Sequence, residues 1–232
     1  MKQNDSAILL HRVNYSDTSL IVTMYTLHQG VQKFIFQGGK KKATSLFPFS
    51  VCEIEYYNRP DSELGKLTSV TSNEASLANI SDNPIKNTIA FFATDILRKC
   101  LLTNQADFQV FEFIRSSITR LCQTKDTSLF MVRFLIEFAE QLGIQPNITS
   151  ENSPFFNLQE GEFCSFKIPG ELIVQGESVT LIQELIRNND IGPTPKTIRM
   201  EALEVMLRYY TLHIPTFNIQ KSLEIVRDIL YD

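Results

Sequence analysis

The sequence is poor in the residues that most often build metal and catalytic sites. It holds three histidines and four cysteines in 232 residues, all scattered along the chain. It contains no C-x-x-C pair and no H-E-x-x-H, G-x-S-x-G or G-x-G-x-x-G motif. We therefore expect reduced, buried thiols, no metal or other cofactor, and a protein that is not an enzyme.

The sequence also lacks a long apolar segment. No run approaches the ~18 apolar residues of a membrane span. The first ten residues, MKQNDSAILL, are too polar for a signal peptide. These absences predict a soluble, cytoplasmic protein.

Charge is unevenly distributed. The net charge is −4, which alone argues against nucleic acid as a partner. However, residues 1–42 hold six basic and two acidic residues, whereas residues 81–232 hold 14 basic and 19 acidic ones. The distribution of charge matters more than its sum, so a basic N-terminal surface is expected.

The first third of the chain has the patterns of β-strands. Apolar or alternating segments at 6–15, 18–28, 31–37, 50–58 and 67–74 are separated by turn residues. Five short strands in about 70 residues favour a small closed barrel, for which the OB-fold is the best candidate.

Helical periodicity begins after residue 80. Asn83 and Pro84 form a typical helix start, and Ile85, Ile89, Phe92 and Ile96 follow at helical spacing. Further helices are predicted by the sequence stretches 110–121, 130–142 (ended by Gly143), 179–187, 195–212 (capped by Thr194) and 219–230. Residues 144–176 show no helical period and are expected to be irregular.

The fold class is therefore α+β, with an N-terminal five-stranded OB-fold barrel followed by an all-helical domain. We predict an OB-fold DNA-binding domain at 1–80 and a helical domain at 81–232, interrupted by the irregular segment 144–176.

A basic, glycine-containing segment gives the strongest local signal. Phe36-Gln37-Gly38-Gly39-Lys40-Lys41-Lys42 combines glycines, which allow close backbone approach, with three consecutive lysines. On a barrel face this pattern suits phosphate contact, with Phe34 or Phe36 available to stack on unpaired bases. The spacing excludes a P-loop. A lysine loop exposed only to solvent is the alternative.

The helical part carries a second candidate surface. Arginines on amphipathic helices could border an apolar groove and bind an acidic peptide through its carboxylates. The residues considered are Arg115, Arg120, Arg133, Arg199, Arg208 and Lys221. Ordinary solvated helix faces are the more common explanation, since most proteins carry arginines on their helices.

The order of several fragments resembles the RecO family of bacterial recombination mediators over nearly the whole chain, and its Bacteroidetes branch most. The resembling fragments are Ala7–Leu10, Asn14–Val22, Tyr25-Thr26, Gly30, Gln37–Lys41, Leu46–Phe49, Leu67-Thr68, Asn73-Glu74, Leu142–Asn147, Tyr209–His213 and Lys221–Leu223.

This resemblance implies an N-terminal OB-fold, a C-terminal helical domain and a role in DNA repair and recombination after DNA damage. It implies binding of single- and double-stranded DNA, strand annealing, and help in loading RecA onto strands coated by single-strand-binding protein. The implied partners are DNA, RecR and the acidic C-terminal tail of single-strand-binding protein, with RecA as an indirect partner. No interaction with a membrane is implied, and the implied location is the cytoplasm, in association with the nucleoid. The matched positions point to Lys40, Lys41 and Lys42 as DNA-binding residues, with Arg12, Lys33 and Phe36 as weaker candidates.

One departure from the family concerns zinc. Many members carry four zinc-binding cysteines in the segment matching residues 144–176, where this sequence has Cys164 alone. Structural zinc needs four Cys or His ligands, so no zinc is expected. We expect aromatic packing by Phe155, Phe156, Phe163 and Phe166 to hold the segment together instead.

Two alternatives from other functional classes stay open. An OB-fold that binds RNA, or serves assembly, with no role in recombination would carry the same basic segment. A nuclease acting through carboxylates would require metal-dependent DNA cleavage.

Overall fold

The computed structural model describes residues 2–41, 46–58, 62, 64–72, 74–150, 153–167, 169 and 172–230, apart from the side chains of 74–77, 221 and 230. The chain divides into two compact units, Met1–Lys125 and Asp126–Asp232. Among the described residues, no helix has the length and apolar content to cross a membrane. The lysine-segment residue Lys42 lies outside the described residues.

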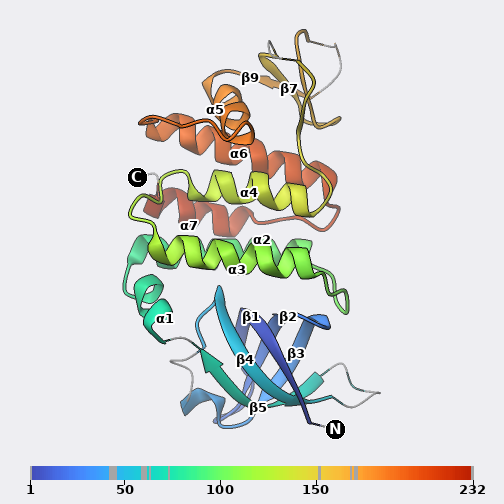
Figure 1. Cartoon of the computed structure of the whole chain (residues 1–232), viewed down its shortest axis with the longest axis vertical. Helices are drawn as coiled ribbons and strands as arrows, with labels where there is room; N and C mark the ends of the chain where they lie inside the picture. The colour runs from blue at the N-terminus through green and yellow to red at the C-terminus, as the bar shows by residue number, and fades with distance from the viewer. Residues whose placement is uncertain are drawn as a thin grey trace. The chain divides into compact units, whose positions relative to one another are not determined.

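The first unit is built on a closed barrel of five strands (Figure 1). The strands are β1 (Lys2–Asn14), β2 (Leu20–Thr26), β3 (Gly30–Phe36), β4 (Ser50–Tyr57) and β5 (Leu64–Ser72). Their order around the barrel is β1-β2-β3-β5-β4, with β3 and β5 parallel and the other pairs antiparallel. This is the OB-fold arrangement, which confirms the predicted fold class.

The barrel interior is filled by alternate residues of each strand. In β2 and β3, Val22 and Phe34 face inward, because successive side chains of a strand point to opposite faces. The Phe34 ring packs against Tyr56 of β4 at a centroid distance of 5.0 Å. The remaining core residues are Ala7, Leu9, Leu20, Met24, Phe36, Leu46, Cys52, Ile54 and Leu67.

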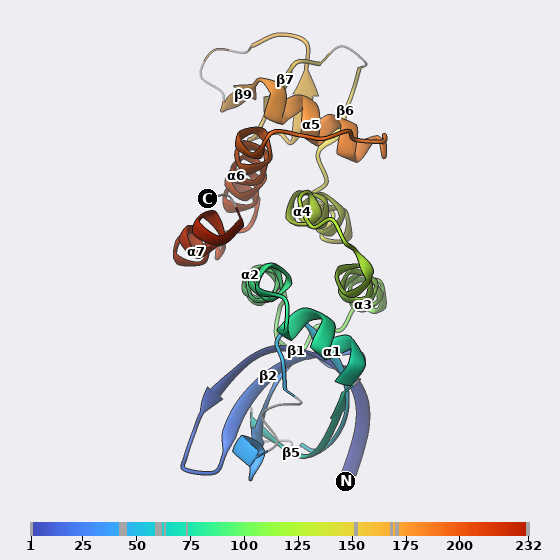
Figure 2. The ribbon, with the colours of Figure 1, turned by 90° about the vertical axis from the view of Figure 1, so that its left-hand side faces the viewer.

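Three helices complete the first unit. Helix α1 (Glu74–Ser81) leads into α2 (Pro84–Cys100) and α3 (Phe108–Gln123), which run side by side over the barrel (Figure 2). The predicted helix start is confirmed, since the Asn83 side chain accepts hydrogen bonds from the amides of Ile85 and Lys86. Ile85 itself is exposed, so the predicted buried stripe begins at Ile89.

The connection between α2 and α3 packs closely on the β2–β3 hairpin. The Tyr25 hydroxyl donates to the Asp107 carbonyl (3.2 Å) and accepts from the Asp107 amide (3.0 Å). Gly30 has φ +69°, and a Cβ added there would lie 2.3 Å from the Gln105 carbonyl oxygen. Only glycine therefore fits at this point of contact.

The described residues of the second unit form four helices. They are α4 (Phe130–Gln141), α5 (Glu177–Ile186), α6 (Lys196–His213) and α7 (Gln220–Leu230). Helix α4 is followed by Gly143 at φ +70°, as predicted. The Tyr210 hydroxyl of α6 donates a hydrogen bond to the Leu135 carbonyl of α4 (2.7 Å). The prediction that Thr194 caps α6 is wrong, because Pro195 holds the cap position and no side chain caps the helix.

The described part of 144–176 is not wholly irregular, contrary to the prediction. It contains a small sheet of β6 (Asn147–Ile148), β8 (Glu162–Cys164), β7 (Phe155–Asn157) and β9 (Ile173–Gln175), in that order. These strands have two or three residues each, too few to show an alternating pattern in sequence.

Aromatic side chains hold this small sheet to α6. The rings of Phe156 and Phe163 stack at 4.4 Å, and Tyr209 packs on Phe156 at 5.5 Å. Two of the four predicted aromatics thus form the core, whereas Phe155 is half-buried and Phe166 is 67% exposed. Tyr209 was not predicted for this role; its hydroxyl donates to the Ile144 carbonyl (2.6 Å).

The domain boundary that we predict near residue 80 lies at the end of α1, a few residues after the change from strands to helices between Ser72 and Glu74. It lies inside the first compact unit, since α1–α3 pack with the barrel. It stays a prediction.

Candidate nucleic-acid interface

The lysine segment lies at the end of the barrel, directly after β3. Residues 39–41 form one turn of 3₁₀ helix, and the Lys40 amide donates to the Thr18 carbonyl at 3.3 Å. The segment therefore adjoins the β1–β2 loop. The Lys41 side chain is exposed and that of Lys40 is half-buried.

Glycine is required where this segment crosses the barrel end. A Cβ at Gly39 would lie 2.8 Å from the Phe36 ring and 3.3 Å from Leu20. The backbone thus rests on core side chains, and this close approach brings Lys40 and Lys41 to the rim of the barrel.

Two further lysines lie on the outer face of the barrel. Lys33 is exposed on β3, on the side opposite the buried Phe34 and Phe36. Lys66 of β5 is also exposed and pairs in register with Ile35, so it is a near neighbour of Lys33 across the parallel β3–β5 pair. Sequence reasoning missed Lys66, because this pairing joins distant segments. We call Lys33, Lys40, Lys41 and Lys66 the lysine face.

Two predicted site residues do not join this face. Phe36 is 1% exposed in the barrel core, so the prediction that it stacks on bases is wrong, and Phe34 is buried in the same way. Arg12 of β1 pairs with Val22, so its side chain points to the side of the strands opposite to that of Lys33.

The charges of the lysine face are not neutralised within the described part of the chain. No described carboxylate lies within ion-pair distance of Lys33, Lys40, Lys41 or Lys66. Four such ammonium groups on one barrel can therefore attract a polyanion.

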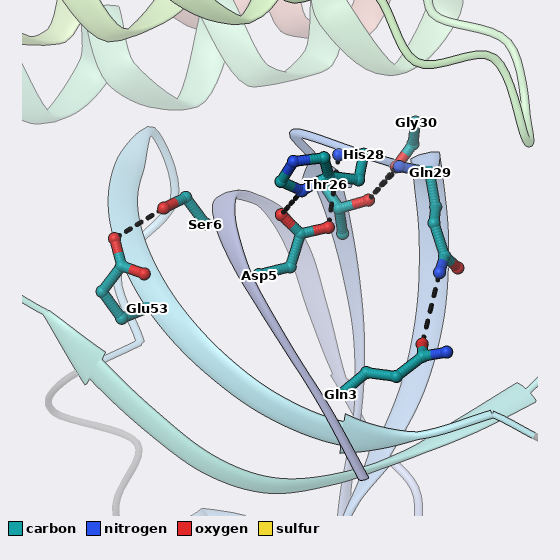
Figure 3. A network of polar contacts seen from close by, with 8 residues as sticks. All are labelled: Gln3, Asp5, Ser6, Thr26, His28, Gln29, Gly30 and Glu53. Atoms are coloured by element: carbon teal, nitrogen blue, oxygen red, sulfur yellow. Dashed lines mark hydrogen bonds and ion pairs between the residues drawn. The ribbon is translucent and has the colours of Figure 1, made fainter. Parts of the chain in front are cut away.

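The acidic residues of the barrel strands, by contrast, have partners. The Asp5 carboxylate accepts from the His28 amide at 3.2 Å and lies 2.8 Å from the His28 Nδ1 (Figure 3). The Ser6 hydroxyl donates to Glu53 at 2.7 Å, and Lys2 pairs with Glu55 at 2.7 Å. Each of these described strand carboxylates thus has a polar partner of its own.

Exposed aromatic side chains also lie on the barrel. Tyr15 of the β1–β2 loop is 59% exposed and Tyr57 at the end of β4 is 43% exposed. Tyr57 pairs in register with Lys66. Only the alternation of β4 distinguishes the exposed Tyr57 from the buried Tyr56 in the sequence.

The arginines considered for a peptide site are divided between the two units. On α3, Arg115 pairs with Glu112, and Arg115 and Arg120 line a hollow of about 530 Å³ with Thr119 and Gln123. In the second unit, a hollow of about 330 Å³ between α6 and α7 is lined by polar and apolar residues, among them Arg208, Arg227, Leu207, Phe217 and Leu223.

Arg199 donates to the Ser128 carbonyl at 3.3 Å and Arg133 is half-buried. The side chain of Lys221 lies outside the described residues.

The four cysteines form no disulfide. Cys52 and Cys100 are buried as predicted, and burial raises the pKa of the Cys52 thiol to about 11 and that of Cys100 to about 12. Cys122 and Cys164 are only half-buried, contrary to the prediction. The described residues contain no group of three or more His, Cys, Asp or Glu side chains arranged to hold a metal ion.

Comparison with known proteins agrees with the fold. Residues 1–75 match the family model for the N-terminal part of recombination protein O, and residues 81–222 match the model for its C-terminal part. The chain is 30% identical over 240 residues to the DNA repair protein RecO of Phocaeicola vulgatus, covering 99% of each chain.

Further relatives have the same name. The chain is 28% identical to DNA repair protein RecO of Christiangramia forsetii, covering 96% of this chain and 97% of the relative. It is also 28% identical to the protein of that name from Bacteroides fragilis, with 99% of each chain covered. The resemblance found in the sequence is confirmed: the chain belongs to the RecO family of DNA repair proteins.

Proposed function

We propose that this protein binds single- and double-stranded DNA through the lysine face, anneals complementary strands and assists the loading of RecA onto strands coated by single-strand-binding protein. The observation that carries the proposal is the set of four lysines without ion-pair partners among the described residues, on an OB-fold of a DNA-repair family.

The proposed action is electrostatic and involves no covalent chemistry. Lysine contacts to phosphates release counterions and are independent of sequence, so binding is strong at low salt and weak at high salt. Such contacts can hold two strands of any sequence and still let them move past one another, which annealing requires.

The proposed protein partners are RecR and the acidic tail of single-strand-binding protein. An acidic peptide with an apolar end needs a cation beside an apolar hollow. Our candidate for the peptide site is the α6–α7 hollow, where Arg208 and Arg227 lie beside the buried Phe217. Arg227 already pairs with Glu204, so the peptide would compete with that carboxylate.

Neutralising the lysine segment tests the DNA-binding proposal. We expect the triple variant Lys40→Ala, Lys41→Ala, Lys42→Ala to bind DNA less tightly and to reduce the log–log salt slope on single strands by about 2, since each lost phosphate contact contributes ~0.7. Fluorescence anisotropy titrations at several salt concentrations measure both quantities.

The matched control removes the same charge elsewhere. Lys125, Lys167 and Lys196 belong to none of the barrel strands, and replacing all three by alanine gives the same net charge. This control should keep the wild-type slope. Equal slopes for the wild type and the segment variant would remove the lysine segment from the site.

Two assays separate the proposal from its alternatives. Annealing of complementary DNA strands is expected, and its absence alongside tight RNA binding would favour the RNA-binding alternative. Incubation of DNA with magnesium or manganese should give no cleavage; metal-dependent cleavage by pure protein would establish a nuclease.

A further inference from the structure

The outer surface of the barrel carries an apolar row beside the lysine face. Register pairs Val13 of β1 with Ile21 of β2, Ile21 with Ile35 of β3, Ile35 with Lys66 of β5, and Lys66 with Tyr57 of β4. We call these five residues the outer row.

From the outer row we infer that the site prefers DNA with unpaired bases, and that Tyr57 is the side chain on which a base stacks. This inference rests on the proposed function, and it specifies the type of strand that the same surface selects.

The side chains of the outer row point away from the core. Their strand neighbours Val22, Phe34, Phe36, Tyr56 and Leu67 are buried. Because side chains alternate between the two faces of a strand, Val13, Ile21, Ile35 and Tyr57 point to the outside. Val13 and Tyr57 are each 43% exposed, and Ile21 and Ile35 are half-buried.

The row crosses the strands at nearly right angles. Because the barrel is closed, the whole row runs round it, and only neighbouring members share one face. Neighbouring strands lie about 4.8 Å apart, so the three successive positions Ile35, Lys66 and Tyr57 span about 10 Å. This face places an aromatic ring beside a cation, which is the combination that OB-folds use when they bind single strands.

Charge surrounds the apolar side chains. Lys66 lies within the row, between Ile35 and Tyr57, and Lys33 lies two residues before Ile35 on β3. The lysine segment continues from the same end of β3. Cations beside an apolar, aromatic surface match a ligand that has both phosphates and flat apolar rings, which is a nucleic acid strand with accessible bases.

A duplex cannot use the apolar part of this surface. Its bases are paired and stacked inside the helix, so only phosphates reach the lysines. Single strands gain the stacking contribution as well, because an exposed tyrosine offers a ring face to any base.

Three variants at one position test the inference. We expect Tyr57→Ala to weaken binding of a 15-mer oligo-dT by roughly tenfold, the loss of about one stacked base. Binding of a 15-base-pair duplex should change by less than about twofold. Tyr57→Phe keeps the ring and should bind both ligands like the wild type, while Tyr57→Leu should resemble Tyr57→Ala.

Phe166→Ala is the matched control, since Phe166 is an aromatic residue 67% exposed in the other compact unit. It should leave both affinities unchanged. Thermal unfolding of each variant shows whether the barrel is intact, and the intermediate exposure of Tyr57 makes a large loss of stability unexpected.

The outcomes separate this inference from the proposed function. Suppose that Tyr57→Ala lowers the affinities for oligo-dT and for the duplex equally, or lowers neither. The stacking inference is then overturned, even if the triple lysine variant still binds DNA less tightly than the wild type. If the wild-type protein binds neither ligand, the proposed function itself fails.

Discussion

The tip of the β2–β3 hairpin and the lysine face lie on the same barrel, but their polar groups have different surroundings. At the hairpin tip (Thr26–Gly30), the Thr26 hydroxyl donates to the Gly30 carbonyl and accepts from the Gln29 amide, and Asp5 holds His28. On the lysine face, Lys33, Lys40, Lys41 and Lys66 have no described ion-pair partner.

The difference shows how a small barrel divides its surface. Buried polar groups at the hairpin tip contribute to stability because removing one partner leaves the other unsatisfied. Exposed lysines contribute little to stability, so they are available for a ligand. Substitutions at the tip should therefore change folding, whereas substitutions on the lysine face should change binding.

The largest effect on stability is expected at Gly30. Gly30→Ala forces an L-residue into φ +69° and places a methyl group 2.3 Å from the Gln105 carbonyl oxygen. We expect the free energy of unfolding to fall by roughly 3 kcal/mol. Chemical denaturation measures the loss.

Gly38→Ala is the natural comparison for Gly30→Ala. Gly38 has a similar φ of +70° but nothing within 4 Å of an added Cβ. Only the backbone strain applies there, about 1–2 kcal/mol. Equal losses for the two variants would show that contact with the α2–α3 connection is unimportant.

A smaller loss is expected from removing the carboxylate of Asp5. Asp5 is 5% exposed, and Asp5→Ala leaves the His28 amide without its acceptor. We expect a loss of about 1–3 kcal/mol in the free energy of unfolding, and a smaller loss for Asp5→Asn, which keeps one acceptor. The shift of the urea midpoint at constant m-value measures this loss. Asp17→Ala is the control, since Asp17 is exposed.

The smallest effect concerns His11, on the outer face of β1. Burial, and then the nearby charge of Arg98, lower the pKa of His11, while Asp95 opposes them. The unfolded chain therefore binds the His11 proton more readily than the folded one, and this residue reduces stability as pH falls below about 6.5. His11→Gln should lose less stability than the wild type between pH 7 and pH 5, and parallel denaturation curves would contradict this.

Alternation and helix caps made much of the fold predictable from sequence. The strand pattern of 51–57 correctly separates Ile54 and Tyr56 from Glu53 and Glu55, and Asn83 marks the start of a helix. The sheet of residues 147–175 was not predictable, because strands of two or three residues leave no period and its core depends on Tyr209, far away in sequence.

The candidate site was only partly predictable for a related reason. Alternation shows that Phe34 and Phe36 share one face and Lys33 and Ile35 the other, but it does not show which face a closed barrel encloses. Lys66 and Tyr57 join Ile35 only through the parallel β3–β5 pair and the β4–β5 pair, which local sequence patterns do not reveal.

The parallel pairing of β3 with β5 has a practical consequence. A peptide covering residues 31–42 would carry Lys33, Lys40 and Lys41 but would lack Lys66 and the tyrosine beside it. The selection that we propose between unpaired and paired DNA therefore requires the assembled tertiary structure. If that proposal holds, the ratio of the two affinities reports whether β3 and β5 have paired during refolding.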